Sequence, residues 1–238
     1  LLALAGWRSG FVFAGAGAAI WLASTFFILP ETRPTATGSS TQAIHRTYLG
    51  LFRDRGFLSF MLTHSVAYAG LYCFVAGAPY FFIQSLGVTP ASFGLMAAAV
   101  MSGFLIGSFA ARYASPRWGM KRVILASLVI ILGASAILAG LAVLGSLPAS
   151  LIVAMEFAWW FGAGFLAPNT AAGVMMSHPK AAGAAAAVLG FVAMCAAATV
   201  SAMQGLIYDG SLFPMVGMQV VLSCASLLIW VRLSRPEP

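Results

Sequence analysis

Few residues of this chain can do chemistry, and most of them are single polar side chains within long apolar stretches. Glu156 is the only acidic residue inside such a stretch, close to Trp159 and Trp160. A carboxylate at the centre of a membrane costs about 2.5 kcal/mol or more, which makes Glu156 a functional candidate that can bind protons or cationic ligands. The alternative is an interfacial charge near the start of a helix, in reach of water.

A second candidate group is a row of polar-tipped rings. His64, Tyr68 and Tyr72 recur every four residues, which places them on one face of a helix. Imidazole and phenol groups are costly against lipid, so this face should point into the helix bundle or into a cavity. The predicted substrate cavity comprises these rings and four further residues: His64, Tyr68, Tyr72, Pro79, Glu156, Trp160 and Asn169.

Two of the apolar stretches are interrupted by proline. Gly77 precedes Pro79 in one, and Gly162 and Gly164 precede Pro168 in the other. Proline removes a backbone hydrogen bond, and such kinks are tolerated where the backbone is buried in protein or faces a wet cavity. These helices are therefore candidates for lining a pathway, with a static kink as the alternative. Asn169 and Thr170 are expected to bond the carbonyl that Pro168 leaves free.

Other kinds of site have no matching pattern. Three cysteines without C-x-x-C spacing argue against disulfides and zinc, and we find no nucleophile–base pair, P-loop or nucleotide fingerprint. The 12 basic and 5 acidic residues give a net charge of +7, but the basic residues are spread along the chain rather than clustered for nucleic acid. The sequence therefore predicts no enzyme activity, no cofactor, no metal site and no nucleic-acid partner.

The elements that position these side chains follow from the composition. Of 238 residues, 61% are hydrophobic and 7% are charged, and the mean hydropathy is +0.97. Soluble domains have about 25% charged residues, so the solvent of this chain is a lipid bilayer. Spanning segments must satisfy their own backbone hydrogen bonds, and these stretches are too long for barrel strands, so we expect an all-α polytopic membrane protein. Seven spans are predicted, at Ser9–Leu29, Phe57–Phe82, Phe93–Tyr113, Val123–Leu144, Leu151–Met175, Ala184–Gln204 and Phe213–Val231.

The basic residues predict the orientation, because loops rich in Lys and Arg stay on the cytoplasmic side. Eleven of them lie in alternate connections and the tail, and only Arg8 lies on the other side. The C-terminus is thus predicted to be cytoplasmic and the N-terminus of this chain outside, in the cell inner (plasma) membrane. Leu1 is not an initiator methionine, and no basic leader precedes the first span, so we expect a fragment of a longer protein.

The connections also predict how the helices group. Residues 30–56 are the one long polar connection, so the first helix is expected to belong to a different bundle from the next six. Ala99, Gly103, Gly107 and Ala111 follow each other at four-residue spacing, which is typical of a helix–helix contact in lipid. No internal repeat is evident in the sequence.

Several segments resemble a known family in order and spacing. Gly6-Trp7-Arg8 opens a helix that ends in Phe27-Ile28-Leu29-Pro30-Glu31-Thr32, which resembles the sixth helix of major facilitator transporters of the drug:proton antiporter group, particularly the Bcr/CflA subfamily. Ala78-Pro79-Tyr80 is similar to that family's seventh helix, residues 162–169 to its G-x-G-x-x-x-P-N stretch in the tenth, and residues 182–190 to the start of its eleventh.

The basic turn between the third and fourth spans resembles the second copy of the family's gating-loop motif. The residues that match are Arg112, Arg117, Gly119, Lys121 and Arg122. Arg112 stands where the first copy of the motif usually has aspartate, which is a departure from the pattern.

The resemblance implies helices six to twelve of a twelve-helix transporter that exports small amphipathic drugs or metabolites, with protons as the coupling ion. Residues 1–29 would be the last helix of the N-terminal bundle, 30–56 a cytoplasmic linker, 57–231 the C-terminal six-helix bundle and 232–238 a cytoplasmic tail. The N-terminal helices of the same protein would be its missing partner, and the fragment would be inactive alone.

Alternative functions remain open at this point. Another major facilitator substrate class, a sugar or an organic anion, is the first, although such sites usually need several amide or charged side chains in the spans. A seven-helix receptor is more distant, because the last span has no lysine and the outer loops have no cysteine. A channel is a third class, but no filter-like loop or ring of charges is visible.

Overall fold

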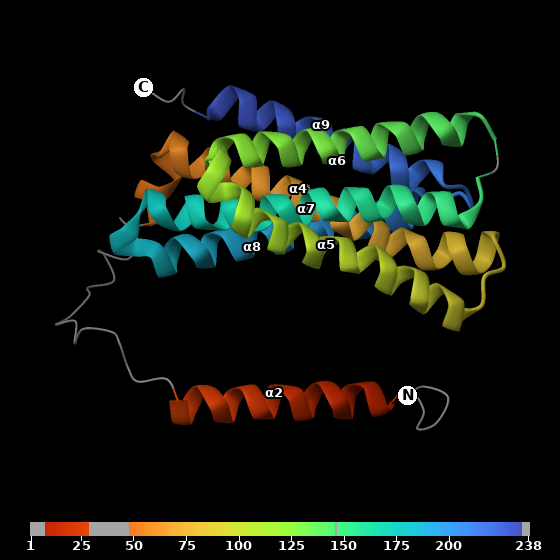
Figure 1. Ribbon diagram of the computed structural model, residues 1–238, viewed down its shortest axis with the longest axis horizontal. Helices are drawn as coiled ribbons and strands as arrows, with labels where there is room; N and C mark the ends of the chain where they lie inside the picture. Colours follow the sequence, from red (N-terminus) through yellow and green to blue (C-terminus); the bar gives the residue numbers. More distant parts are fainter. Residues whose placement is uncertain (1–7, 29–47, 146, 235–238) are drawn as a thin grey trace. The chain divides into compact units, whose positions relative to one another are not determined.

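The computed structural model describes residues 8–28, 48–145 and 147–234. The chain divides into two units, Leu1–Ala43 and Ile44–Pro238, which are described separately. In the first unit the described part is one helix, α2 (Arg8–Ile28), with no acidic residue in its sequence (Figure 1). Throughout the described residues the regular structure is helical and contains no strand.

The second unit is a bundle of six long helices. A π-helical turn, η1 (Tyr80–Ser85), continues the first of them, and a short 3-10 turn, η2 (Pro179–Ala181), precedes the fifth. The long helices are α4 (Arg55–Pro79), α5 (Pro90–Trp118), α6 (Met120–Val143), α7 (Ala149–Ser177), α8 (Ala182–Ile207) and α9 (Phe213–Leu233).

Seven helices in the described residues are long and apolar enough to cross a membrane, which confirms the predicted all-α, seven-span fold. Polar caps begin two of them before the apolar runs. Asp54 accepts a hydrogen bond from the Gly56 amide at 2.8 Å, so α4 begins two residues before its predicted start. Thr89 accepts from the Ser92 amide in the same way and begins α5 at Pro90.

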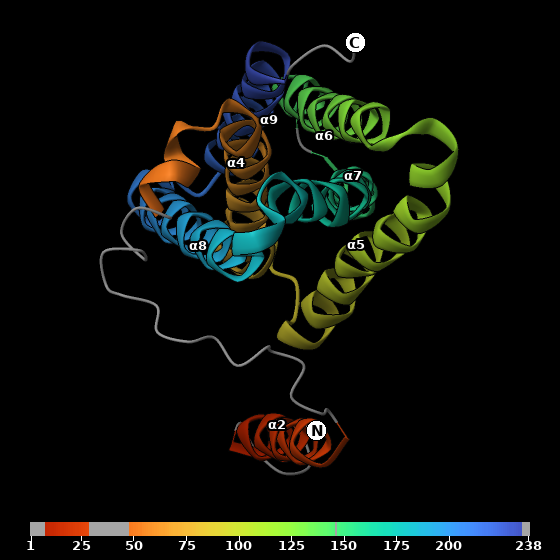
Figure 2. The same cartoon turned by 90° about the vertical axis from the view of Figure 1, so that its left-hand side faces the viewer.

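The bundle is built around a central pair of helices, α4 and α7. Figure 2 shows both in the middle, with α5 and α8 flanking them and α6 and α9 together on one side. α5 and α6 pack on α7, whereas α8 and α9 pack on α4. The central pair supplies many of the large buried side chains, including Phe57, Phe74, Trp159 and Leu166.

The packing has an internal symmetry that the sequence does not reveal. α5 packs on α7 as α8 packs on α4, and α6 packs on α7 as α9 packs on α4. Exchanging α4–α6 with α7–α9 therefore preserves the main contacts. Figure 1 shows α4 and α7 running in opposite directions, so the two halves are inverted three-helix units, an arrangement typical of secondary transporters.

Glycines bring α5 and α7 into backbone contact. A Cβ atom added to Gly103 would lie 2.6 Å from the Phe157 carbonyl oxygen, and one added to Gly107 or Gly164 would also meet backbone of the facing helix. The predicted small-residue contact is therefore confirmed for Gly103, Gly107 and Ala111, which are buried. It is wrong for Ala99, which is exposed.

The two prolines have different effects. At Pro79, α4 gives way to the π-helical turn, whereas α7 continues through Pro168. The Gly164 carbonyl, four residues before Pro168, accepts a hydrogen bond from Ser108 Oγ of α5 at 3.2 Å. The expectation that Asn169 or Thr170 fills this role is wrong. Each of them bonds the carbonyl four residues before itself, Phe165 and Leu166 respectively.

Candidate functional site

The structure brings the three predicted rings of α4 together. His64 and Tyr68 stack with ring centroids 5.8 Å apart and planes 12° apart, and Tyr68 and Tyr72 are 5.6 Å apart. All three side chains are half-buried. The periodic spacing thus produces one continuous aromatic face, as the sequence predicts.

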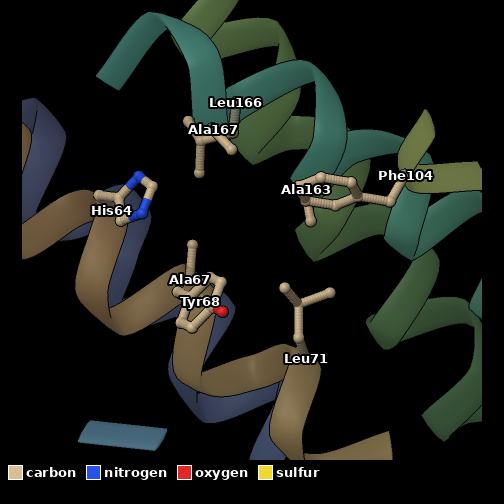
Figure 3. Close-up of a pocket in the computed structure, with 8 residues that line it drawn as sticks. All are labelled: His64, Ala67, Tyr68, Leu71, Phe104, Ala163, Leu166 and Ala167. Carbon is tan, nitrogen blue, oxygen red and sulfur yellow. The ribbon is translucent and has the colours of Figure 1, made fainter. Parts of the chain in front are cut away.

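This face borders a small hollow between α4, α5 and α7. Figure 3 shows His64, Ala67, Tyr68 and Leu71 of α4 opposite α7. Phe104 of α5 closes one side, and the α7 wall consists of Ala163, Leu166 and Ala167. The hollow holds about 10 Å³, which is room for about one water molecule, whereas ligand pockets measure about 300–1,000 Å³. It is therefore one wall of a candidate binding site.

A hydrogen bond across α4 and α7 orients the imidazole. His64 Nδ1 lies 2.8 Å from Thr170 Oγ1, and Thr170 Oγ1 lies within 3.2 Å of the Leu166 and Ala167 carbonyl oxygens. When the single hydroxyl proton of Thr170 is donated to its own backbone, Oγ1 accepts from His64 Nδ1–H. The remaining ring nitrogen, Nε2, is then free to accept a hydrogen bond when the ring is neutral.

Glu156 occupies a different part of the bundle, between α7 and α9. Its side chain is 1% exposed, so the interfacial alternative does not hold. Gln219 Nε2 of α9 donates to Glu156 Oε2 at 3.1 Å. Nearby, Ser223 Oγ accepts from Trp159 Nε1 at 3.3 Å and donates to the backbone carbonyl oxygen of Gln219. The carboxyl group is thus buried and held by one hydrogen bond from Gln219, beside a second set of polar bonds around Ser223.

The other predicted cavity residues do not join the rings. Trp160 packs edge-on against Phe74, with centroids 5.9 Å apart, and is nearly buried. Asn169 lies on the α5 side of α7, where its Oδ1 accepts from Ser115 Oγ at 2.7 Å. Pro79 is the last residue of α4. The seven predicted residues are therefore distributed along the α4–α7 core, with His64, Tyr68 and Tyr72 as one cluster.

The predicted gating turn is a tight connection between α5 and α6. Arg112, Arg117 and Arg122 are exposed, and Lys121 is half-buried. Gly119 has φ +80°, a conformation that favours glycine, and it separates the two helices by a single residue. The basic side chains are thus gathered at one end of the bundle.

Sequence reasoning did not single out Gln204 or Gln219 as site residues. Both are at most 1% exposed, although each is a polar side chain in an apolar run. The signal available was an amide within a membrane-spanning helix, since a lipid-facing amide would be unfavourable.

The chain is similar to a known bacterial protein. No family model matches the chain. The chain is 25% identical over 212 residues to YdgK of Bacillus subtilis (strain 168), an uncharacterized MFS-type transporter. The match covers 87% of this chain and 50% of YdgK, so the chain spans about half the length of that relative. The chain is thus similar to a transporter of the major facilitator type, and its seven helices that are long and apolar enough to span a membrane support a multi-pass membrane protein.

Proposed function

We propose that this chain is part of a secondary active transporter that exports small amphipathic drugs or metabolites by proton antiport, as its resemblance to the Bcr/CflA subfamily implies. In this proposal α4–α9 correspond to the C-terminal bundle predicted at residues 57–231, α2 is the last helix of the N-terminal bundle, residues 30–56 are the linker and 232–238 the tail. Alternating access needs a second bundle, so transport would require the N-terminal helices as well.

The observation that carries the proposal is the aromatic and apolar lining of the hollow between α4, α5 and α7. Its wall residues are alanine, leucine and phenylalanine, and its polar groups are one imidazole and one tyrosine hydroxyl. Such a surface binds apolar cargo of variable shape through contact area, with few directional bonds. A sugar site would instead need several amide or charged side chains.

Protons are the coupling ion in this proposal, and the bilayer is the inner (plasma) membrane. The buried carboxyl of Glu156 supports this choice, because an ionisable group enclosed in a membrane bundle is typical of proton pathways. The turn that contains Arg112, Arg117, Gly119, Lys121 and Arg122 would lie on the cytoplasmic side and serve as the gating loop. Positive charge at that side follows the usual distribution in membrane proteins.

An export assay in an efflux-deficient host tests this function. The host would carry the complete transporter gene. In it we expect Tyr68→Ala and Tyr72→Ala to lower resistance to amphipathic drugs several-fold, because Tyr68 lines the hollow and Tyr72 continues the same aromatic face. Phe109→Ala is the matched control: this α5 ring is 64% exposed and lies about 140° around the helix from Phe104. Equal effects of all three substitutions would contradict the assignment of the wall.

A further inference from the structure

We propose that Glu156 and Gln219 form an acid–amide pair that holds one proton inside the six-helix bundle. This pair would provide the proposed antiport with a proton site, but the inference itself rests on the hydrogen bond between Glu156 of α7 and Gln219 of α9 and on the burial of both side chains. Its test needs no transport, so it can fail or succeed independently of the proposed function.

The geometry leaves a place for one hydrogen atom. Gln219 Nε2 donates to Glu156 Oε2 at 3.1 Å, which is one half of a cyclic acid–amide pair. Among the described residues, the other two oxygens, Glu156 Oε1 and Gln219 Oε1, are buried and have no hydrogen-bond partner. An ionised carboxylate and an amide carbonyl are both acceptors only, so these two oxygens cannot bond each other.

A single added proton would give both unpaired oxygens a hydrogen-bond partner. When a proton from water binds to Glu156 Oε1, the new O–H becomes a donor, and Gln219 Oε1 is the unpaired acceptor on the side chain already bonded to Glu156. One O–H bond forms, the carboxyl becomes neutral, and the water that gave the proton leaves as hydroxide. The pair then has two parallel hydrogen bonds in place of one, and neither buried oxygen is left unpaired. Each unpaired buried acceptor costs about 1–3 kcal/mol.

The surroundings favour the neutral form of this pair. Glu156 and Gln219 are 1% and 0% exposed, and within the described chain no Lys, Arg or His lies at ion-pair distance from Glu156. The titratable group that faces it from α4 is the buried thiol of Cys73. Two other polar side chains nearby, Trp159 of α7 and Ser135 of α6, each bond Ser223. Neither of them titrates in the ordinary pH range. An ionised Glu156 would thus be a buried charge without a counter-ion, which is strongly unfavourable.

Infrared spectroscopy of the 238-residue chain in lipid tests the pair directly. Glutamate labelled with carbon-13 at the carboxyl marks only Glu31, Glu156 and Glu237. At neutral pH we expect the carbonyl band of one neutral carboxylic acid, with the two other glutamates ionised. Glu156→Gln should abolish this band, and Gln219→Leu should shift it because the hydrogen bonds to the amide are lost.

Two further variants act as controls. Gln204→Leu removes another buried glutamine, 1% exposed, that does not bond Glu156, and it should leave the band unchanged. The exchange Glu156→Gln with Gln219→Glu keeps one acid and one amide, so the neutral-acid band should return. Because two facing glutamine side chains can also form a cyclic amide pair, the single variant Glu156→Gln is expected to fold. Its melting temperature should change less with pH than that of the unaltered chain.

Three results would overturn the inference. They are an ionised carboxylate in place of the acid band at neutral pH, a band that persists in Glu156→Gln, and loss of the band when sodium replaces potassium at constant pH. The last would show that the two oxygens bind a metal cation in place of a proton.

Discussion

At the scale of single residues, the chain places isolated polar side chains inside an apolar bundle and pairs them across helices. His64 bonds Thr170, Ser115 bonds Asn169, and Gln219 bonds Glu156. Each bond joins two different helices, because a polar group in this environment has no water to replace a lost partner. These contacts fix which helix faces meet.

The bond between His64 and Thr170 is a measurable example. A double-mutant cycle with His64→Ala and Thr170→Val should give a coupling free energy of about 0.5–1.5 kcal/mol, since Thr170 is buried and His64 is half-buried. The measurement is thermal or denaturant unfolding of the four proteins in detergent. A coupling of zero would mean that the imidazole does not bond the hydroxyl in the membrane protein.

The sequence predicts which of these residues share a helix face, but not which residues pair across helices. The spacing of His64, Tyr68 and Tyr72 predicts a shared face because helical periodicity fixes the direction of each side chain. Periodicity within one helix says nothing about which other helix lies opposite. The pairing of Glu156 with Gln219, 63 residues later, therefore depends on where the bundle places α9 relative to α7.

At the scale of helices, close approach of backbones holds α5 to α7. Gly103, Gly107 and Gly164 each leave no space for a Cβ atom beside the facing helix. In lipid, where apolar side chains gain little by leaving one apolar medium for another, such contacts supply packing that the hydrophobic effect cannot. The crossing of α5 and α7 thus depends on residues that have no side chain.

Gly107→Ala should destabilise this crossing. The added methyl group would meet the backbone of Phe161, which cannot turn aside, so we expect a loss of about 1–3 kcal/mol in the free energy of unfolding. Gly94→Ala in the same helix is the control, because a Cβ atom there meets nothing within 4 Å. Unfolding of both variants in detergent gives the comparison, and similar stabilities would refute the tight crossing.

The seven helices themselves were predictable from hydropathy, because a bilayer requires long apolar helices regardless of tertiary contacts. Their ends were less so. Capping by Asp54 and Thr89 and the single-residue turn at Gly119 depend on local polar bonds and backbone conformation outside the apolar runs. The inverted symmetry of α4–α6 and α7–α9 was not visible, because the two halves share a packing pattern without an evident sequence repeat.

At the scale of the whole molecule, the basic residues set the orientation that we expect. Eleven of 12 lie in alternate connections or the tail, so the turn between α5 and α6 and the C-terminus should face the cytoplasm. A tag placed after Pro238 should be inaccessible to antibody in intact cells and become accessible when the membrane is permeabilised. Labelling in intact cells would show the opposite orientation.

The central claim is that the face formed by α4, α5 and α7 lines a transport pathway and does not contact lipid. Cysteine labelling tests it most directly, in a background where the three native cysteines are replaced. Ala167→Cys lies in the wall of the hollow, and Val129→Cys, on α6 and 56% exposed, is the lipid-facing control. A hydrophilic, membrane-impermeant thiol reagent should label the Ala167→Cys variant much faster than the Val129→Cys variant. Equal and negligible labelling of both variants would contradict the account.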